Sequence, residues 1–253
     1  MKLYNIVFSP TGGTKKVADY LTGTLEGEVT TVDLADNKQN FDAVSLMTED
    51  VAIISVPSYG GRVPAVAAQR LSLVHGSGAR AVLVCVYGNR AYEDTLVELE
   101  DAAKQAGFQV IAAVAAVAEH SIARQFAAGR PDGMDTAQLS NFAKQIRLKL
   151  SENNLTEPAI PGNRPYKKAG GAGLVPKPTK ECVRCGVCAQ ACPVQAIDKD
   201  DPKKVDDKAC ISCMRCISIC PHNARKANPV MLAAVGVALK KVCSERKECE
   251  LFL

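Results

Sequence analysis

Eight cysteines late in the chain recur as two copies of one pattern. The stretches CVRCGVCAQACP and CISCMRCISICP start 28 residues apart, and each has three cysteines at three-residue intervals followed by a fourth before proline. Thiolates are soft ligands that suit zinc, copper(I) and iron–sulfur clusters. The pattern therefore predicts a metal group. The cysteines are Cys182, Cys185, Cys188 and Cys192 in the first copy, and Cys210, Cys213, Cys216 and Cys220 in the second.

The spacing is typical of [4Fe-4S] clusters. Three thiolates in one tight loop reach three irons of one cubane, and the fourth lies too far along the chain and ligates the other cubane. Zinc sites usually pair two C-x2-C knuckles instead. We therefore predict two [4Fe-4S] clusters with crossed ligands, and residues 178–228 resemble a bacterial two-cluster ferredoxin. The predicted ligands are Cys182, Cys185, Cys188 and Cys220 for cluster one, and Cys210, Cys213, Cys216 and Cys192 for cluster two.

A loop near the start of the chain has the composition of an anion site. The stretch SPTGGT separates an apolar run from a helical pattern. Amides at a helix N-terminus carry partial positive charge, hydroxyls add donors, and glycines let the backbone come close. Neither a Walker loop nor a Rossmann fingerprint is present, and a plain strand-to-helix turn is the alternative. The predicted phosphate cradle consists of Ser9, Pro10, Thr11, Gly12, Gly13 and Thr14.

Two further loops follow later apolar runs and place an aromatic residue beside glycine. Such loops suit one face and the edge of a flat ring, and ligands bind at the carboxyl ends of strands in open parallel sheets. Plain packing is the alternative for each tyrosine. The candidate cofactor-binding residues are Pro57, Ser58, Tyr59, Gly60, Gly61 and Arg62 in the first loop, and Tyr87, Gly88, Asn89, Arg90 and Tyr92 in the second.

The elements that must position these loops alternate between strand and helix patterns. This alternation predicts an α/β fold with a parallel sheet covered on both faces, and the unbroken apolar runs fit strands buried on both sides. The expected strands are Leu3–Phe8, Val29–Leu34, Val51–Val56, Ala81–Val86 and Val110–Val117, and the expected helices lie near 14–25, 63–74, 92–106 and 135–150.

Residues 1–150 resemble the flavodoxins, through S-x-T-G-x-T in the first loop, Tyr59-Gly60 in the second and Gly88-Asn89 with Tyr92 in the third. The resemblance implies a five-stranded sheet of order 2-1-3-4-5 and FMN, rather than FAD or a nicotinamide cofactor, between the two tyrosines. Asn89 replaces a common acid. Arg62 and Arg90 bring positive charge where flavodoxins are usually acidic, and we expect a less reducing flavin as a result.

The segment Glu119–Met134 is longer than a short flavodoxin needs between its last strand and last helix. It could cover a small substrate bound over the flavin. His120 would then be the candidate for a proton donor and Arg130 for an anion anchor. The simpler interpretation of His120 is an ordinary loop or strand-end residue.

Composition divides the chain into modules. Residues 1–150 carry 14 basic and 16 acidic side chains, and residues 151–253 carry 17 and 11, so the net charge changes from −2 to +6. The stretch TEPAIPGNRPYKKAGGAGLVPKPTK is rich in Pro and Gly and predicts an extended linker. We expect an FMN-binding domain at 1–155, a basic linker at 156–177, a 2[4Fe-4S] ferredoxin domain at 178–228 and a helical tail at 229–253.

The remaining features point to a cytoplasmic protein. All but one of the 11 cysteines follow residue 180, and Val230–Leu239 is too short to cross a bilayer. The early run Leu3–Phe8 is too short for a signal peptide, and a net charge of +4 is too small to imply nucleic acid. Cys85 is expected in the core, whereas Cys243 and Cys249 receive no role.

As a whole, the chain resembles the ferredoxin–flavodoxin fusion proteins of anaerobic bacteria. This resemblance implies an iron–sulfur flavoprotein that converts between one-electron and two-electron traffic. Two interpretations stay open: an electron carrier between redox partner proteins, some of them acidic, or an FMN-dependent reductase of a small-molecule acceptor. A cluster protein with an empty flavodoxin domain is a third.

Overall fold

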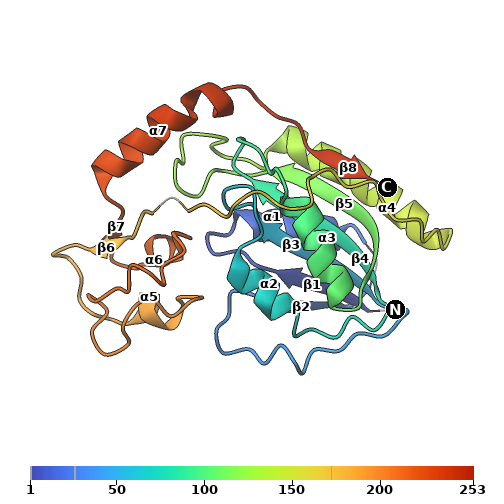
Figure 1. Ribbon diagram of the computed structural model, residues 1–253, viewed down its shortest axis with the longest axis horizontal. Helices are drawn as coiled ribbons and strands as arrows, with labels where there is room; N and C mark the ends of the chain where they lie inside the picture. The colour runs from blue at the N-terminus through green and yellow to red at the C-terminus, as the bar shows by residue number, and fades with distance from the viewer. Residues whose placement is uncertain (1, 26, 172) are drawn as a thin grey trace.

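The computed structural model describes residues 2–25, 27–171 and 173–253. The first part alternates strands and helices as the sequence predicts, and a compact second part follows (Figure 1). The first part comprises β1 (Leu3–Val7), α1 (Gly13–Gly23), β2 (Val29–Asp33), β3 (Val51–Pro57), α2 (Ala65–Leu71), β4 (Arg80–Tyr87), α3 (Thr95–Gln105), β5 (Gln109–Val117) and α4 (Gly133–Ser151).

Six strands form the main sheet, in the order β2-β1-β3-β4-β5-β8. The first five are parallel, which confirms the predicted order 2-1-3-4-5. The sixth, β8 (Glu250–Phe252), pairs antiparallel with β5 and was missed, because three residues at the end of the chain carry no periodic signal. It covers the edge of β5 that would otherwise be open for pairing.

Helices cover both faces of the sheet, and each face has its own core. On one face α1 and α4 contribute Val17, Leu21, Leu139 and Ile146. On the other, α2 and α3 pack through residues such as Leu71, and Cys85 lies fully buried there, as expected. Because the strands are buried on both faces, side chains of either parity are apolar. The sheet is therefore a rigid base for the loops at its carboxyl edge.

The second part lies beside the carboxyl ends of the parallel strands (Figure 1). Its elements are β6 (Lys177–Pro178), α5 (Val187–Gln190), α6 (Arg215–Ser218) and β7 (Arg225–Lys226), and β6 pairs antiparallel with β7. The helices are single turns that follow Gly186 and Met214, both in the left-handed conformation. The small α+β architecture agrees with the sequence-based prediction of a ferredoxin-type unit.

The segment between the two parts is extended but is not a free tether. Asp94, at the start of α3, accepts hydrogen bonds from the backbone amides of Asn163 (2.9 Å) and Lys167 (2.7 Å). Arg164 forms ion pairs with Glu100 (2.8 Å) and Asp101 (2.6 Å). These contacts hold the segment along α3, so it is an ordered connection between the two parts.

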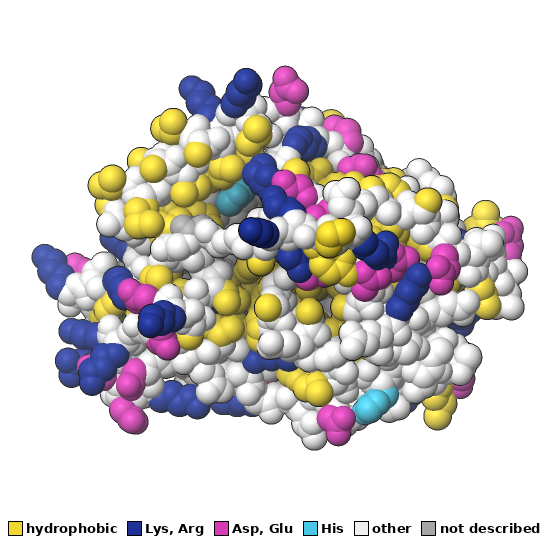
Figure 2. All heavy atoms as spheres, viewed as in Figure 1, with side chains coloured by type: hydrophobic (Ala, Val, Ile, Leu, Met, Phe, Trp, Pro, Cys, Tyr) yellow, Lys and Arg dark blue, Asp and Glu magenta, His cyan; other side chains and the backbone are white. Residues whose placement is uncertain are grey.

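After the second part the chain returns to the first. Helix α7 (Pro229–Cys243) begins with an Asn228 cap, and the segment from Ser244 onward leads into β8. The tail is thus a helix and a strand, not a helix alone. Apolar side chains such as Val230 and Val237 are exposed on α7, where Figure 2 shows hydrophobic atoms on the surface. In the described part of the chain, no helix has both the length and the apolar character to cross a bilayer.

Candidate functional site

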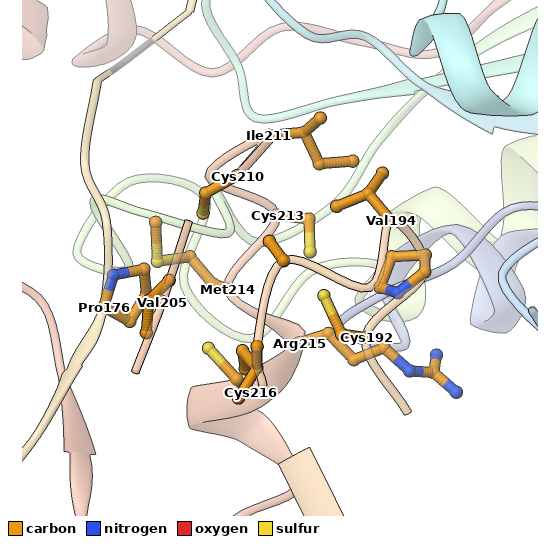
Figure 3. A pocket seen from close by; sticks show the side chains of 13 residues that line it. Pro176, Cys192, Val194, Val205, Cys210, Ile211, Cys213, Met214, Arg215 and Cys216 are labelled. Atoms are coloured by element: carbon orange, nitrogen blue, oxygen red, sulfur yellow. The ribbon is translucent and has the colours of Figure 1, made fainter. Parts of the chain in front are cut away.

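The structure gathers the eight repeated cysteines into two groups, and each group contains the fourth cysteine of the other copy. Figure 3 shows the side chains of one group around a common cavity. This is the crossed arrangement that the spacing requires. The first cavity is lined by Cys192, Cys210, Cys213 and Cys216, and the second by Cys182, Cys185, Cys188 and Cys220.

The two cavities differ in exposure. Cys185 is exposed in the second cavity, and Val183 and Val187 beside it are 60% and 39% exposed. In the first cavity no cysteine is exposed, and Cys213 is buried. We call the first cavity the inner cysteine site and the second the outer cysteine site.

The thiols of the inner site are strongly desolvated. Burial raises the pKa of Cys213 to about 11 and that of Cys216 to about 12, and neighbouring cysteines add to the effect. Loading such a site with a metal group must therefore release protons, because only thiolates ligate. In the described part of the chain, no three His, Cys, Asp or Glu side chains converge closely enough for a single metal ion. Eight thiols around two cavities fit larger clusters.

A third cavity opens at the carboxyl edge of the sheet, where the predicted flavin loops meet. Nine of the candidate cofactor-binding residues line it, together with His120, the candidate for a proton donor. Four further residues also line it: Val86 and Ala118 lie at or just beyond predicted strand ends, and Glu119 and Ser121 lie in the segment Glu119–Met134 that was predicted to cover a substrate. The predicted lining residues are Pro10, Thr11, Gly13, Thr14, Pro57, Ser58, Tyr59, Tyr87 and Gly88, and the additional ones are Val86, Ala118, Glu119 and Ser121.

The geometry of the first loop fits a phosphate group. Gly12 is the N-cap of α1 with φ of 92°, and no side chain caps the helix. Its first-turn amides are thus left to an anion, except that Lys15 N donates to Ser9 Oγ (2.8 Å). Thr14 is buried beside them. A Cβ on Gly12 would meet nothing within 4 Å, so glycine is needed there for its backbone conformation and not for space.

His120 lies inside the cavity, against Gly88. A Cβ on Gly88 would lie 2.6 Å from the imidazole, so only glycine leaves room for this ring. The Nδ1 atom accepts from the amides of Ile122 and Ala123, both at 3.1 Å. The proton of the neutral ring is therefore on Nε2. Burial lowers the pKa of His120, and the positive charge of Arg90 lowers it further.

The two arginines predicted near the flavin do not line the cavity. Arg62 donates to Glu98 (2.7 Å) and lies over the ring of Tyr166 at 4.9 Å. Arg90 pairs with Glu93 at 2.7 Å. Each charge is balanced by a carboxylate, so the basis for a less reducing flavin is removed.

Three other candidate site residues contact the C-terminal segment and do not line the cavity. Asn89 is buried and donates to the carbonyls of Cys243 (2.8 Å) and Glu245 (2.7 Å). Tyr92 Oη lies 3.2 Å from Glu250 in β8. The guanidinium of Arg130 is buried against Asp135 (Nε to Oδ2, 2.9 Å) and also donates to the Lys247 carbonyl. The structure therefore gives Arg130 a structural role, not that of an anion anchor.

Gly60 and Gly61 lie in the tight turn that joins Tyr59 to Arg62, with φ of 62° and 84°. A Cβ on Gly60 would lie 2.8 Å from the carbonyl of Gly170, so the extended segment passes directly beside this turn. These positions require glycine because their φ values fall in the left-handed region.

Contacts between the two parts bring the inner cysteine site against the flavodoxin-like sheet. Asn37 Nδ2 donates to the carbonyls of Gln190 (3.0 Å) and Cys192 (2.8 Å). Arg70 bridges the Leu34 carbonyl (2.6 Å) and the Pro193 carbonyl (2.7 Å). Sequence reasoning missed both residues, since an Asn in a loop and an Arg in the last turn of a helix have no distinctive pattern.

Tyr59 links the inner cysteine site to the cavity at the carboxyl edge. It lines that cavity. Burial raises the pKa of its hydroxyl well above the usual value, and the negative charge of a Cys213 thiolate adds to this. Tyr59 therefore lines the cavity and lies within electrostatic reach of the inner cysteine site.

Comparisons with known proteins agree with this division. The family model described as "4Fe-4S dicluster domain" matches residues 181–224. One of the subunits of tetrathionate reductase from Archaeoglobus fulgidus is 42% identical over 67 residues, which are 26% of this chain and 32% of that protein. The chain thus spans about a third of the length of this relative.

Solved flavodoxins match the first part of the chain. A flavodoxin from the domain Archaea has a TM-score of 0.42 and 13% identity, and the match covers 60% of this chain and 99% of that one. Oxidised Flavodoxin 1 from Bacillus cereus has a TM-score of 0.43 and 16% identity over 58% and 98%. The assignment of the fold rests on the strand order itself.

Proposed function

We propose that this chain, which joins a flavodoxin-like unit to a 4Fe-4S ferredoxin-type unit, is an intracellular electron carrier that holds FMN and two [4Fe-4S] clusters. A cluster passes single electrons and a flavin stores one or two, so the pair connects one-electron and two-electron partners. The protein would supply the thiolate ligands of the clusters, position the cofactors and exclude water from them.

The observation that carries the proposal is the order of the three sites. The outer cysteine site is open to solvent at Cys185, and the inner site follows it. Tyr59 lines the cavity at the carboxyl edge of the sheet, and the charge of a Cys213 thiolate in the inner site acts on its hydroxyl. Residues Asn37 and Arg70 keep this order by holding the inner site against the sheet. A redox partner would exchange electrons at the outer site.

The surface of the outer site favours an acidic partner. Residues 178–228 contain nine Lys and Arg against six Asp and Glu, a net charge of +3. Figure 2 shows Lys and Arg side chains over this end of the molecule. Exposed Val183 and Val187 supply an apolar centre beside Cys185, and Arg184 and Lys180 lie in the same loop. Apolar contact with a complementary charged rim suits a transient redox complex.

Cofactor analysis tests the proposal first. Anaerobically purified protein should contain FMN, and about eight irons and eight sulfides per chain would correspond to two cubane clusters. FAD in the acid-released extract would contradict the FMN assignment. Iron content near half of that value would contradict two clusters.

The crossed ligation can be tested with two single variants. Cys192→Ala should damage the inner cluster, and Cys220→Ala should damage the outer one, because each residue belongs to the other repeat's cavity. Iron content and paramagnetic spectra of the two variants should therefore differ. Loss of the same cluster in both would refute the crossing.

The surface at which the redox partner docks can be tested in the intact chain. Arg184→Glu should slow reduction by a small acidic ferredoxin and weaken the salt dependence of the rate. Lys144→Glu, a change of equal charge at an exposed position of α4, is the control and should have little effect. Equal effects of both variants would mean that net charge, and not the outer site, steers the partner.

His120 supports a second candidate, an FMN-dependent reductase. Its Nδ1 is held by two backbone amides, so a neutral ring carries its proton on Nε2 within the cavity. Such a group can supply a proton to a small acceptor. Steady-state turnover of a small acceptor that falls in His120→Ala, while reduction by a protein donor is unchanged, would favour the reductase over the carrier.

A further inference from the structure

The ferredoxin-type unit buries an arginine almost completely. Arg225 in β7 is 2% exposed and is the largest of the fully buried side chains among the residues that the structure describes. It donates to the carbonyls of Pro176 (3.2 Å) and Pro202. Within the described residues its hydrogen bonds go to carbonyls and none goes to a carboxylate, and its Nε is buried without a partner. A buried charge without a counter-charge costs several kcal/mol, so the compensation must come from another group.

The position of Arg225 points to the cysteine sites as the source of this compensating charge. Its side chain lines the outer cysteine site, beside Cys220 and Pro202. Cys188 of the outer site packs in one apolar cluster with Cys192 and Cys216 of the inner site. The guanidinium therefore lies in the wall of the outer site, and the inner site adjoins that site.

We propose that Arg225 is the fixed counter-charge of the two clusters, and that its Nε–H donates to sulfur at the outer site. The inference rests on the proposed cluster content. Each cluster gains one negative charge when it accepts an electron from a donor. A nearby buried positive charge favours the more negative state, and hydrogen bonds to sulfur act in the same direction. Arg225 would therefore raise both reduction potentials.

The test is an anaerobic redox titration followed by paramagnetic resonance. In Arg225→Met, which keeps an unbranched side chain without the charge, each cluster should be harder to reduce. At a fixed potential the ratio of reduced to oxidised cluster should fall at least tenfold, which is about 59 mV for a one-electron couple. Lys226→Met removes a charge from the neighbouring exposed residue and should leave the ratio within twofold.

Two further variants separate charge from structure. Arg225→Gln keeps a donor for the carbonyls without the charge, and Arg225→Lys keeps the charge. The Gln variant should behave like Met, and the Lys variant should stay near the wild type. If Met and Gln fail to assemble clusters and Lys succeeds, a requirement for the charge is still supported. Failure of all three would instead indicate that the guanidinium shape alone is needed, which would overturn the proposal.

The same measurements distinguish this inference from the proposed function. A wild-type protein without clusters would refute the proposed function and, with it, the role of Arg225. A wild-type protein with both clusters, together with an Arg225→Gln variant of unchanged potentials, would refute the counter-charge alone.

Discussion

Replacing Asn89 should release the C-terminal segment from the flavodoxin-like unit. The side chain is 3% exposed, and three of its hydrogen bonds hold the chain near residues 243–247: two donated to the Cys243 and Glu245 carbonyls and one accepted from Lys247 N at 3.1 Å. Each is worth about 1 kcal/mol net, so Asn89→Ala should cost about 3 kcal/mol. The φ of 65° adds about 1 kcal/mol, because alanine is disfavoured there.

Two further variants separate the conformational part of this cost from the part due to lost hydrogen bonds. Asn153 also has a positive φ, 50°, but it is exposed at the end of α4, so Asn153→Ala should show only the conformational part, about 1 kcal/mol. Asn89→Gly removes the strain and keeps the loss of hydrogen bonds, so it should cost about 3 kcal/mol.

Urea unfolding and hydrogen exchange measure the effect. The free energy of unfolding gives the total, and amides in Glu250–Phe252, which pair with β5, should lose protection in Asn89→Ala. A cost no greater than that of Asn153→Ala, with β8 still protected, would refute the view that Asn89 anchors the tail. Loss of FMN binding without loss of stability would instead support the original prediction that Asn89 binds the cofactor.

Three further predictions concern the interface and the flavin cavity. Arg70→Ala should slow electron transfer within the chain by up to about tenfold in stopped flow, because a charged hydrogen bond between the units is lost; an unchanged rate would argue against this docking. Gly12→Ala should weaken FMN binding about tenfold in a fluorescence titration, since φ is 92°, whereas Gly23→Ala, with open space around it, should not. The His120 imidazole should titrate by NMR below its usual pKa of about 6.5. Its contribution to stability should be complete above that pH and decrease as the pH falls toward the folded-state pKa. A pKa above 7 would contradict a neutral, partly buried ring.

Local sequence was sufficient to predict those elements and sites whose structure depends mainly on a short stretch of the chain. The five strands and their parallel sheet follow from alternating apolar runs, because burial on both faces leaves a continuous apolar signal. Their order 2-1-3-4-5 was implied by the resemblance to the flavodoxins, and the structure has the same order. The cysteine spacing predicted two crossed groups, and the structure brings together the same sets. The stretch Ser9–Thr14 predicted the loop between strand and helix, because glycine and hydroxyl residues favour turns.

Tertiary structure decided which residues of the later loops face the cavity. Asn89 and Tyr92 match a flavin loop by sequence, yet they contact a segment more than 150 residues away. Arg62 looked free to face a cofactor until Glu98 and Tyr166 were placed around it. The sequence shows the type of a side chain but not the partner that folding brings to it, and a partner distant in sequence can neutralise a charge or use up every donor.

The same reason explains why the role of Arg225 was not foreseen. An arginine in a basic stretch of sequence suggests a solvated surface charge. Only the fold places it inside the ferredoxin-type unit, in the wall of the outer cysteine site and without a carboxylate among its hydrogen-bond partners in the described residues. Burial and electrostatic environment depend on the whole chain, because they are set by everything that packs around a group.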